Sequence, residues 1–340
     1  MSIYYDNLGS QLASAIARMP SWKKSMHTSA VIFEEPGRLV VDRVELTDPT
    51  HDDLVVDVKW SGISTGTERL LWSGDMPFFP GMGYPLVPGY ETVGVVEEAP
   101  KHLKRRIGEF VFVPGSAAYK DVRGLFGGAA KHIITSTDKA RSLNPDLGAQ
   151  GALLALSSTA YHALVHPMTG KPVLPDLIVG HGILGRLLAR LTVALGGEPT
   201  VWEQNPARQE GASDYRVCVS SDCEGEKYQN IMDVSGDSTI IDQLVGHLAP
   251  QGEIVLAGFY ESRLDFAFPA AFMKEARIRI AAEWSPSDQA AVCQMLERDQ
   301  LSLNNLITDE CAVADASGAY ETAFTDPNCL KMVLNWSDKA

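Results

Sequence analysis

The chain has 340 residues, of which 45% are hydrophobic and 21% charged, and this ordinary globular composition excludes a disordered or collagen-like protein. The 29 lysines and arginines against 43 aspartates and glutamates leave a net charge of −14, so we expect neither nucleic acid nor anionic lipid as a partner. No apolar run is long enough to span a membrane, and Met1 to Ser10 lack the pattern of a secretory signal, so the sequence predicts a cytoplasmic protein.

Cysteine usage agrees with a reducing compartment. The chain has five cysteines, an odd number, widely spaced and with no CxxC pair. The sequence therefore predicts neither a disulfide framework nor a structural zinc site.

The first part of the chain is rich in predicted strands. Residues 1–27 precede these strands; Gln11–Lys24 within them is compatible with a short helix or a loose extension, and we assign it no function. From residue 28 to 150, glycines and prolines separate runs of alternating or apolar residues, which predicts a β-rich domain. The predicted strands are Ala30–Phe33, Leu39–Leu46, Leu54–Trp60, Glu91–Glu98, Glu109–Val113 and Ala130–Thr135.

After residue 150 the pattern changes to alternating strands and helices, which predicts an α/β domain with a doubly wound parallel sheet over residues 151–290. The region opens with a helix-compatible stretch, Asp146–Val165. Residues 291–340 form a C-terminal segment containing the end of a predicted helix, Ser287–Arg298, and a strand, Leu330–Asn335. The other predicted elements are Asp176–Val179, Leu184–Leu195, Thr200–Glu203, Ile231–Val234, Asp242–Leu248 and Glu253–Ala257.

A glycine-rich turn joins the first of these strands to the first helix and reads Gly180-His181-Gly182-Ile183-Leu184-Gly185. In a dinucleotide fold the three glycines permit a tight turn, the approach of a pyrophosphate and close packing of helix on strand. The N–H groups and dipole at the start of the helix then favour the phosphates. We expect His181 to line the cofactor rather than to abstract a proton.

Glu203 stands at the end of the next strand, 18 residues after Gly185. A carboxylate there accepts hydrogen bonds from the ribose hydroxyls and repels a 2′-phosphate, so the sequence predicts NAD rather than NADP. Arg208 leaves the alternative open, because an arginine at this place can receive a 2′-phosphate, stack on the adenine or remain solvated.

Small residues follow the fourth and fifth strands of the predicted parallel sheet. Ser235, Gly236 and Gly258 lie where the carboxyl ends of these strands border the nicotinamide half of a bound cofactor. For either glycine alone, a simple turn role is the better interpretation.

Two segments, Ser61–Glu68 (SGISTGTE) and Pro88–Glu91 (PGYE), resemble the medium-chain dehydrogenase/reductase superfamily. The resemblance implies a GroES-like first domain and a Rossmann second domain. In the zinc alcohol dehydrogenases of that superfamily, a cysteine and a histidine ligate catalytic zinc at the positions of Ser64 and Tyr90. Residues 92–120 and 151–166 also contain no cysteine. Because hydroxyls are poor zinc ligands, the sequence predicts no metal site.

Longer segments are similar to one zinc-free branch of the superfamily, and this similarity covers about residues 28–337. The branch oxidises the 3-(1-hydroxyethyl) group of a bacteriochlorophyllide to 3-acetyl with NAD, late in bacteriochlorophyll a synthesis. The resemblance therefore implies a small-molecule tetrapyrrole substrate. It also implies a possible homodimer joined at the strand Arg277–Ala281, although an internal strand fits those residues equally well. The segments are Ser61–Gly74, Met76–Glu91, Val122–Ala130, Asp176–Leu191, Gly252–Tyr260 and Phe272–Trp284.

Without zinc, the proton of the alcohol must pass to a base or a hydroxyl relay. Ser64 and Tyr90 rank first as relay residues because of the positions they occupy. Thr65 and Thr67 serve either the relay or the turn at Gly66. Glu91 is either a base or a structural carboxylate, and His162 is either a catalytic group or a packed histidine on a helix.

The stretch Trp72–Tyr84 is aromatic and rich in glycine and proline. It predicts either a wall for a flat apolar ligand or a loop packed on its own domain or on a dimer partner. The side chains that would line the substrate pocket are Trp72, Phe78, Phe79, Met82 and Tyr84.

Two other functions remain open at this point. One is a zinc-free NAD(P)H quinone or enone reductase of the same superfamily, which Glu203 disfavours because such reductases mostly use NADPH. The other is a non-catalytic NAD-binding sensor or scaffold, which the hydroxyls around Ser64 disfavour.

Overall fold

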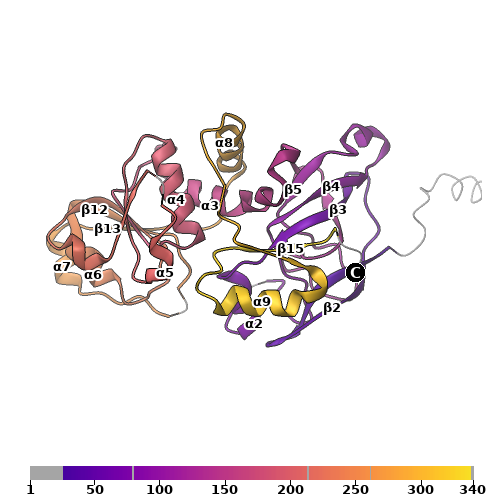
Figure 1. The fold of residues 1–340 in the computed structure, drawn as a ribbon, viewed down its shortest axis with the longest axis horizontal. Helices are drawn as coiled ribbons and strands as arrows, with labels where there is room; N and C mark the ends of the chain where they lie inside the picture. The colour runs from indigo at the N-terminus through magenta and orange to yellow at the C-terminus, as the bar shows by residue number, and fades with distance from the viewer. Residues whose placement is uncertain (1–25, 79, 213, 261, 338–340) are drawn as a thin grey trace, which may run out of the picture.

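The computed structural model describes residues 26–337 except 79, 213 and 261, so the possible helix over Gln11–Lys24 and the pocket residue Phe79 lie outside the described residues. Figure 1 shows an antiparallel sheet at one end of the molecule and a parallel sheet at the other, with α3 and α8 between them. Within the described part of the chain, no helix is long and apolar enough to cross a membrane.

The antiparallel region confirms the predicted β-rich fold. A hairpin, β1–β2, accompanies a seven-stranded sheet with the path β14-β15-β3-β4-β5-β7, and β6 also pairs with β3. Alternate residues of β3 point into the core, and Leu54, Val56 and Val58 are fully buried. The strands are β1 (His27–Glu35), β2 (Arg38–Glu45), β3 (Asp53–Gly62), β4 (Thr92–Glu98), β5 (Phe110–Val113), β6 (His132–Ser136), β7 (Arg141–Ser142), β14 (Asp309–Ala312) and β15 (Met332–Asn335).

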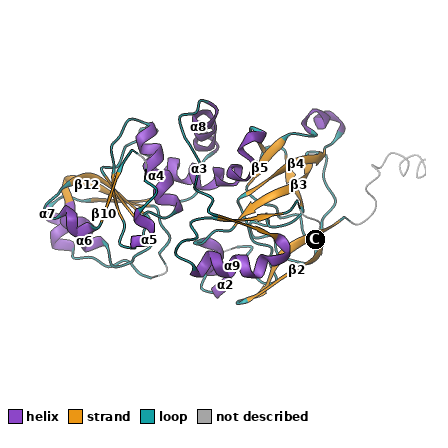
Figure 2. Ribbon diagram, viewed as in Figure 1, coloured by secondary structure: helices purple, strands orange, loops and turns teal. Residues whose placement is uncertain are grey.

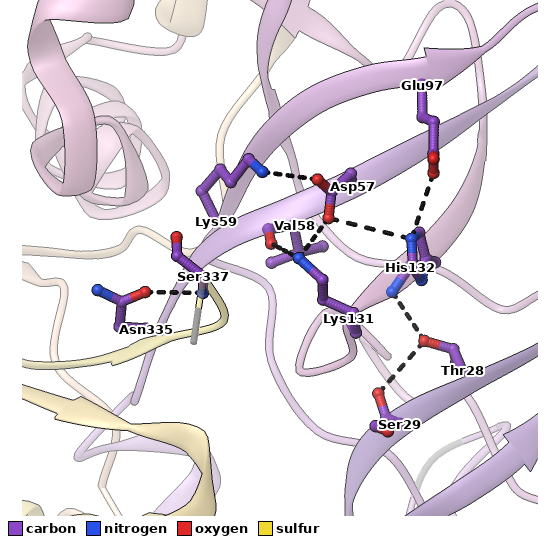
Figure 3. Close-up of polar contacts among 10 residues, drawn as sticks. All are labelled: Thr28, Ser29, Asp57, Val58, Lys59, Glu97, Lys131, His132, Asn335 and Ser337. Atoms are coloured by element: carbon purple, nitrogen blue, oxygen red, sulfur yellow. Dashed lines mark hydrogen bonds and ion pairs between the residues drawn. The ribbon is translucent and has the colours of Figure 1, made fainter. Parts of the chain in front are cut away.

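A small ion cluster lies on the more exposed face of β3 (Figure 3). Asp57 pairs with Lys59 Nζ at 2.6 Å and with Lys131 Nζ at 2.5 Å, and Lys131 Nζ also donates to the Val58 carbonyl at 3.4 Å. These side chains are partly exposed, so we expect the cluster to add little to the free energy of unfolding.

The parallel region has six strands in the order β10-β9-β8-β11-β12-β13, which in chain order is 3-2-1-4-5-6. All its pairings are parallel, as the alternation of strands and helices predicted. Figure 2 shows α4 and the pair α6–α7 on opposite sides of this sheet. The strands are β8 (Leu177–Val179), β9 (Thr200–Trp202), β10 (Arg216–Cys218), β11 (Tyr228–Asp233), β12 (Leu248–Leu256) and β13 (Arg277–Ile280).

One predicted helix is two elements. The stretch expected to be helical over Asp146–Val165 contains a 3-10 segment and then the α-helix α3 (Leu154–Leu164), because Gly148 adopts the non-helical angles φ 50° and ψ −131°. The other helices are α2 (Thr67–Ser73), α4 (Ile183–Ala194), α5 (Pro206–Gln209), α6 (Ile241–His247), α7 (Phe268–Met273), α8 (Pro286–Glu297) and α9 (Ala316–Thr325), with 3-10 turns η1 (Lys101–Arg106), η2 (Pro145–Leu153), η3 (Ser220–Cys223) and η4 (Val313–Asp315).

The C-terminal segment returns to the antiparallel sheet. Strand β15 pairs with β3, so that Val333 lies opposite Gly62. Trp336 is buried, and its indole N–H donates to Ser61 Oγ at 2.8 Å. The last residues of the described chain therefore pack beside the segment that carries Ser64.

Candidate functional site

The glycine turn after β8 has the shape that a dinucleotide requires. Gly180 has φ of +100°, and a Cβ at Gly185 would lie 1.8 Å from the Gly180 carbonyl oxygen, so both positions need glycine. A Cβ at Gly182 would meet only the Arg208 guanidinium, at 4.0 Å, which leaves the backbone open to a ligand. Helix α4 begins at Ile183, and its first N–H groups, including that of Leu184, lie next to this opening.

Glu203 follows β9 and faces the glycine turn. Its Oε2 accepts the His181 backbone N–H at 2.9 Å, and its Oε1 accepts the Asn205 N–H at 2.8 Å. The carboxylate is thereby held beside the phosphate turn, with further lone pairs for a ligand.

The side chain of His181 is part of the protein interior. It is fully buried, with Nδ1 2.6 Å from the Arg208 carbonyl and Nε2 2.8 Å from the Tyr215 hydroxyl. Burial lowers the pKa of His181 to about 4, so the ring is neutral at physiological pH. The ring therefore stabilises the loop after β9 through its hydrogen bonds to Arg208 and Tyr215, and only the backbone of His181 faces the turn.

The ends of β11 and β12 adjoin the same turn. A Cβ at Gly180 would lie 3.2 Å from the Cα of Ser235, and one at Gly258 would lie 3.4 Å from the nitrogen of Gly236. Asp233, the last residue of β11, is buried and accepts the Tyr260 hydroxyl at 2.5 Å and the Ser235 N–H at 3.0 Å. The structure thus brings together the three groups of glycines that the sequence singled out.

Ser64 and Tyr90 lie in direct contact. Their hydroxyl oxygens are 2.8 Å apart, and the Thr67 N–H donates to Ser64 Oγ at 3.3 Å. Burial raises the pKa of the Tyr90 phenol, so Tyr90 keeps its proton at neutral pH. The two leading candidates of the sequence analysis therefore form one hydroxyl pair.

Buried charges lie directly behind this pair. Glu91 is fully buried and forms an ion pair with Lys331, which is 1% exposed. Glu68, also fully buried, accepts the Ser64 N–H at 3.1 Å and the Tyr320 hydroxyl at 2.6 Å. Burial raises the pKa of Glu68 to about 7. Glu91 is thus tied to a lysine in the fold.

A polar hollow of about 260 Å³ lies beside Thr65, the residue that follows Ser64, and beside Arg208, whose guanidinium would lie 4.0 Å from a Cβ at Gly182. Thr65 and Arg69 line one side of it, and Arg208 lines the other, with the end of α9 between them. Arg208 Nε donates to the Pro327 carbonyl at 3.2 Å, so the arginine reaches from the parallel region toward the C-terminal segment. Two arginines therefore line the same hollow, one from α2 and one from α5.

His162 is placed elsewhere. Its Nδ1 lies 2.8 Å from Oδ2 of Asp288, which is the third residue of α8 and caps that helix through Ser285. None of the contacts found in the described chain joins His162 to Ser64 or Tyr90.

The aromatic stretch packs mainly on its own region. The Trp72 ring lies 5.6 Å from that of Phe33, the Tyr84 hydroxyl donates to the Leu71 carbonyl, and Met82 packs against the same core. Phe78 is 86% exposed. Of the described side chains expected to line a substrate pocket, Phe78 is thus the one that faces solvent.

A zinc ion does not fit the hydroxyl pair. Over residues 26–337, with 79, 213 and 261 left out, no group of three or more His, Cys, Asp or Glu side chains is arranged to hold a metal. At the two positions where the resemblance implies metal ligands, the hydroxyls of Ser64 and Tyr90 are hydrogen-bonded to each other. Such oxygens are poor ligands for zinc.

The sequence analysis missed three residues of this site. Glu68 lies inside a segment that was singled out, and its place four residues after Ser64 at the start of a helix was an available signal. Lys331 and Tyr320 gave no local signal, because they meet residues 268 and 252 positions away in the chain.

Comparisons with known proteins agree with this architecture. No family model matches the chain. The chain is 52% identical over 315 residues to 2-desacetyl-2-hydroxyethyl bacteriochlorophyllide A dehydrogenase of Rhodobacter capsulatus, a match that covers 92% of this chain and 99% of that protein. It is likewise 52% identical over 317 residues to the protein of the same name from Cereibacter sphaeroides, with the same coverage.

Among solved structures, an alcohol dehydrogenase from Escherichia coli complexed with NADH superimposes with a TM-score of 0.77. The match covers 91% of this chain and 99% of that one at 20% identity. This likeness confirms the predicted combination of a β-rich and a doubly wound α/β region.

The burial of neutral His181 predicts a pH dependence of stability. Between pH 6.5 and 4 the unfolded chain binds a proton at this ring and the folded chain does not. The free energy of unfolding therefore falls as the pH falls through that window, by at most about 1.4 kcal/mol per pH unit from this group. In His181→Gln this contribution is absent. Urea unfolding at pH 4.5, 5.5 and 6.5 should therefore show a free energy of unfolding that depends less steeply on pH than in the wild type.

The matched control is His51→Gln, since the His51 side chain is 85% exposed and a wild-type slope is expected. If the free energy of unfolding depended equally on pH in the wild type and in His181→Gln, the lowered pKa of buried His181 would be contradicted.

Proposed function

The chain belongs to the bacteriochlorophyllide a dehydrogenases, a family of medium-chain alcohol dehydrogenases, and from this premise we propose that it oxidises the hydroxyethyl side chain of a bacteriochlorophyllide to acetyl. The observation that carries the proposal is 52% identity extending over 99% of relatives bearing that name. The glycine turn and the hydroxyl pair support it, since both halves of an alcohol oxidation, hydride acceptor and proton acceptor, have a candidate place in the fold.

A nicotinamide dinucleotide fits the parallel region. Gly180, Gly182 and Gly185 provide the turn, and the N–H groups of Ile183 and Leu184 at the start of α4 would hold the pyrophosphate. Arg208 and Arg69 add positive charge on the way to Ser64, and Ser235, Gly236 and Gly258 would border the nicotinamide. When bound, this group supplies the acceptor for the hydride.

The cofactor is NAD in this proposal. Glu203 stands where it would accept hydrogen bonds from the ribose hydroxyls, and its charge would repel a 2′-phosphate. Arg208 is the residue that could have favoured NADP, but its Nε is bonded to the Pro327 carbonyl across the hollow. That contact directs the guanidinium toward the pyrophosphate path rather than toward the ribose.

Ser64 and Tyr90 would receive the alcohol. The Thr67 N–H occupies one acceptor position of Ser64 Oγ, so the remaining positions of the pair are available to orient the substrate hydroxyl and to accept its proton. Because burial disfavours the phenolate of Tyr90, the pair passes the proton on rather than storing it. Thr65, which follows Ser64 and lines the polar hollow, would then pass the proton to solvent.

The substrate assists a reaction without metal. Its carbinol carbon is attached directly to a conjugated macrocycle, so positive charge that develops as the hydride leaves is delocalised over the ring system. This lowers the need for a Lewis acid to polarise the alcohol. In this proposal Phe78, which is exposed, would cover a macrocycle face, while Trp72, Met82 and Tyr84 pack on the core of their own region.

A homodimer would join the parallel sheets of two copies. Strand β13 lies at the sheet edge, with Ile280 77% exposed. A hollow of about 480 Å³ beside it is lined by apolar residues that include Phe268, Phe272 and Met273. Antiparallel pairing of two β13 strands would provide hydrogen-bond partners for their edge N–H and C=O groups. It would also bury this apolar surface, whose exposure to water is unfavourable in a monomer.

The function is tested by mixing the protein with 3-(1-hydroxyethyl) bacteriochlorophyllide a and NAD and following visible and near-infrared absorbance. We expect a shift of the long-wavelength band as the acetyl carbonyl enters conjugation, with one NADH formed per pigment.

In Ser64→Ala we expect kcat to fall about 100-fold or more with NADH binding unchanged, as for loss of a proton-transfer group. The wild-type protein should oxidise the pigment much more slowly with NADP than with NAD. In Glu203→Gln the ratio of the NAD rate to the NADP rate should fall about tenfold.

A flat trace with NAD bound would contradict the proposed substrate. It would favour another carbonyl or alcohol substrate, or a cofactor-binding protein without catalysis.

The homodimer is tested by light scattering of Ile280→Lys. A charge on the β13 edge should shift the mass from dimer to monomer. Ile107→Lys, which alters an exposed isoleucine outside the parallel sheet, is the control and should remain dimeric. A wild-type monomer, or an unchanged mass for Ile280→Lys, would refute this interface.

A further inference from the structure

Three ionisable side chains are buried behind the hydroxyl pair, and they come from three parts of the chain. Glu68 is on α2, Glu91 precedes β4, and Lys331 precedes β15, and none is more than 1% exposed. Lys331 Nζ forms an ion pair with Glu91 Oε2, and within the described residues neither side-chain oxygen of Glu91 has any other polar partner. Burying such charges is costly, so their arrangement calls for an explanation.

The charges converge on a single peptide bond. Lys331 Nζ donates to the carbonyl oxygen of Ile63 at 2.8 Å, and the N–H of Ser64 donates to Glu68 Oε1 at 3.1 Å. These are the two polar groups of the peptide that joins Ile63 to Ser64. An ammonium group therefore holds one end of the peptide and a carboxyl group holds the other, and Ser64 follows directly.

Tyr90 is held by the same lysine. Lys331 pairs with Glu91, the neighbour of Tyr90 in the chain, while the Glu91 backbone carbonyl accepts the Gly62 N–H at 2.8 Å. A Cβ at Gly62 would lie 2.2 Å from Glu91 Oε2 and 3.0 Å from Lys331 Cε. Glycine at position 62 thus leaves the room in which the ion pair lies against the backbone.

We propose that Lys331 is a positioning residue for the reaction, which sets the contact between Ser64 and Tyr90 by holding the Ile63–Ser64 peptide and the Glu91 carboxylate at once. Lys331 does not touch the hydroxyls themselves. The inference rests on the proposed function, because it takes these two hydroxyls as the groups that meet the alcohol.

A purely structural ion pair would have different consequences. A buried pair can often be exchanged for neutral groups of similar volume at little cost in stability, whereas loss of one partner alone is strongly destabilising. If Lys331 served only the fold, neutralising both partners would restore function together with stability. If Lys331 positions Ser64, neutralising both partners restores stability but not function, because the Ile63 carbonyl still lacks its hydrogen-bond donor.

The test uses the double variant E91Q/K331M in the full-length protein. We expect it to fold, with a Tm close to that of wild type, and to show the Ser64 Oγ–Tyr90 Oη contact broken in its crystal structure. We expect kcat to fall about 10- to 100-fold, the usual consequence of displacing a reacting group by about 1 Å. KM and the Kd for NADH should remain unchanged, because the glycine turn and the hollow are not altered.

Two further variants keep the test decisive. E91Q/K331Q places an amide at each of the two positions, so that each side chain has a polar partner, but the amide at position 331 is one bond shorter than lysine and does not reach Ile63. It should reproduce the loss if E91Q/K331M does not fold. K331R keeps a charged donor and should retain most of kcat and the hydroxyl contact.

The matched control is D57N/K131M. It removes another pair of a carboxylate and a lysine, in which the lysine also donates to a backbone carbonyl, on the part of β3 shown in Figure 3. No contact of that pair found in the described chain reaches Ser64 or Tyr90, and kcat should remain at the wild-type value.

Retention of the hydroxyl contact and of kcat in the neutral double variants would overturn the inference. So would an equal loss of kcat in D57N/K131M. Failure of wild type to oxidise the pigment would instead refute the proposed function, while the crystallographic contact in wild type and E91Q/K331M still decides the role of Lys331.

Discussion

Strand β15 enters the antiparallel sheet beside β3, and the residues at its start meet the turn that carries Ser64. The Ile63 N–H donates to the Met332 carbonyl at 3.0 Å, and Lys331, one residue earlier, lies beneath the Ile63–Ser64 peptide. Without this pairing the first region would lack the only lysine found against Glu91 among the described residues, and the peptide before Ser64 would lose a hydrogen-bond donor. The order of the candidate site therefore depends on a strand from the far end of the chain.

The local parts of this architecture could be predicted from the sequence because their causes are local. Most strands of both sheets follow from alternating or short apolar runs, whereas the short strands β7, β10 and β14 were not predicted. The nucleotide turn follows from three glycines between a strand and a helix. Glu203 could be assigned to the same site because the acidic residue of such a fold lies about 20 residues beyond the glycine turn, at the end of the next strand. Ser64 and Tyr90 were ranked together through a resemblance, but their contact was not predicted, since the spacing of 26 residues carries no geometric information by itself.

Other features depended on tertiary contacts that no local pattern records. Lys331 and Tyr320 contact Ile63 and Glu68 only because the C-terminal segment returns to the antiparallel sheet. Trp72 and Tyr84 belong to an aromatic stretch that suits a ligand pocket and a packed loop equally, and the structure places both on the core of their own region. The predicted helix over Asp146–Val165 is interrupted at Gly148, where the glycine adopts a conformation that other residues avoid.

The chemical consequence is a site in which two hydroxyls stand where relatives of the superfamily place zinc ligands. In the proposed mechanism, a hydroxyl pair supported by buried carboxyl groups and a lysine takes the part that a metal bound by soft ligands plays in zinc enzymes. Such a site can orient an alcohol and move its proton but cannot strongly polarise the C–O bond. It therefore suits an alcohol whose carbon is already activated by conjugation, which is the property of the proposed substrate.

The most direct test of this account is the metal content of a preparation that oxidises the pigment at its full rate. Elemental analysis should find zinc and other transition metals far below one ion per chain, and dialysis against a chelator should leave the turnover rate unchanged. A stoichiometric metal whose removal abolishes turnover, and whose return restores it, would contradict hydride transfer supported by the Ser64–Tyr90 pair alone.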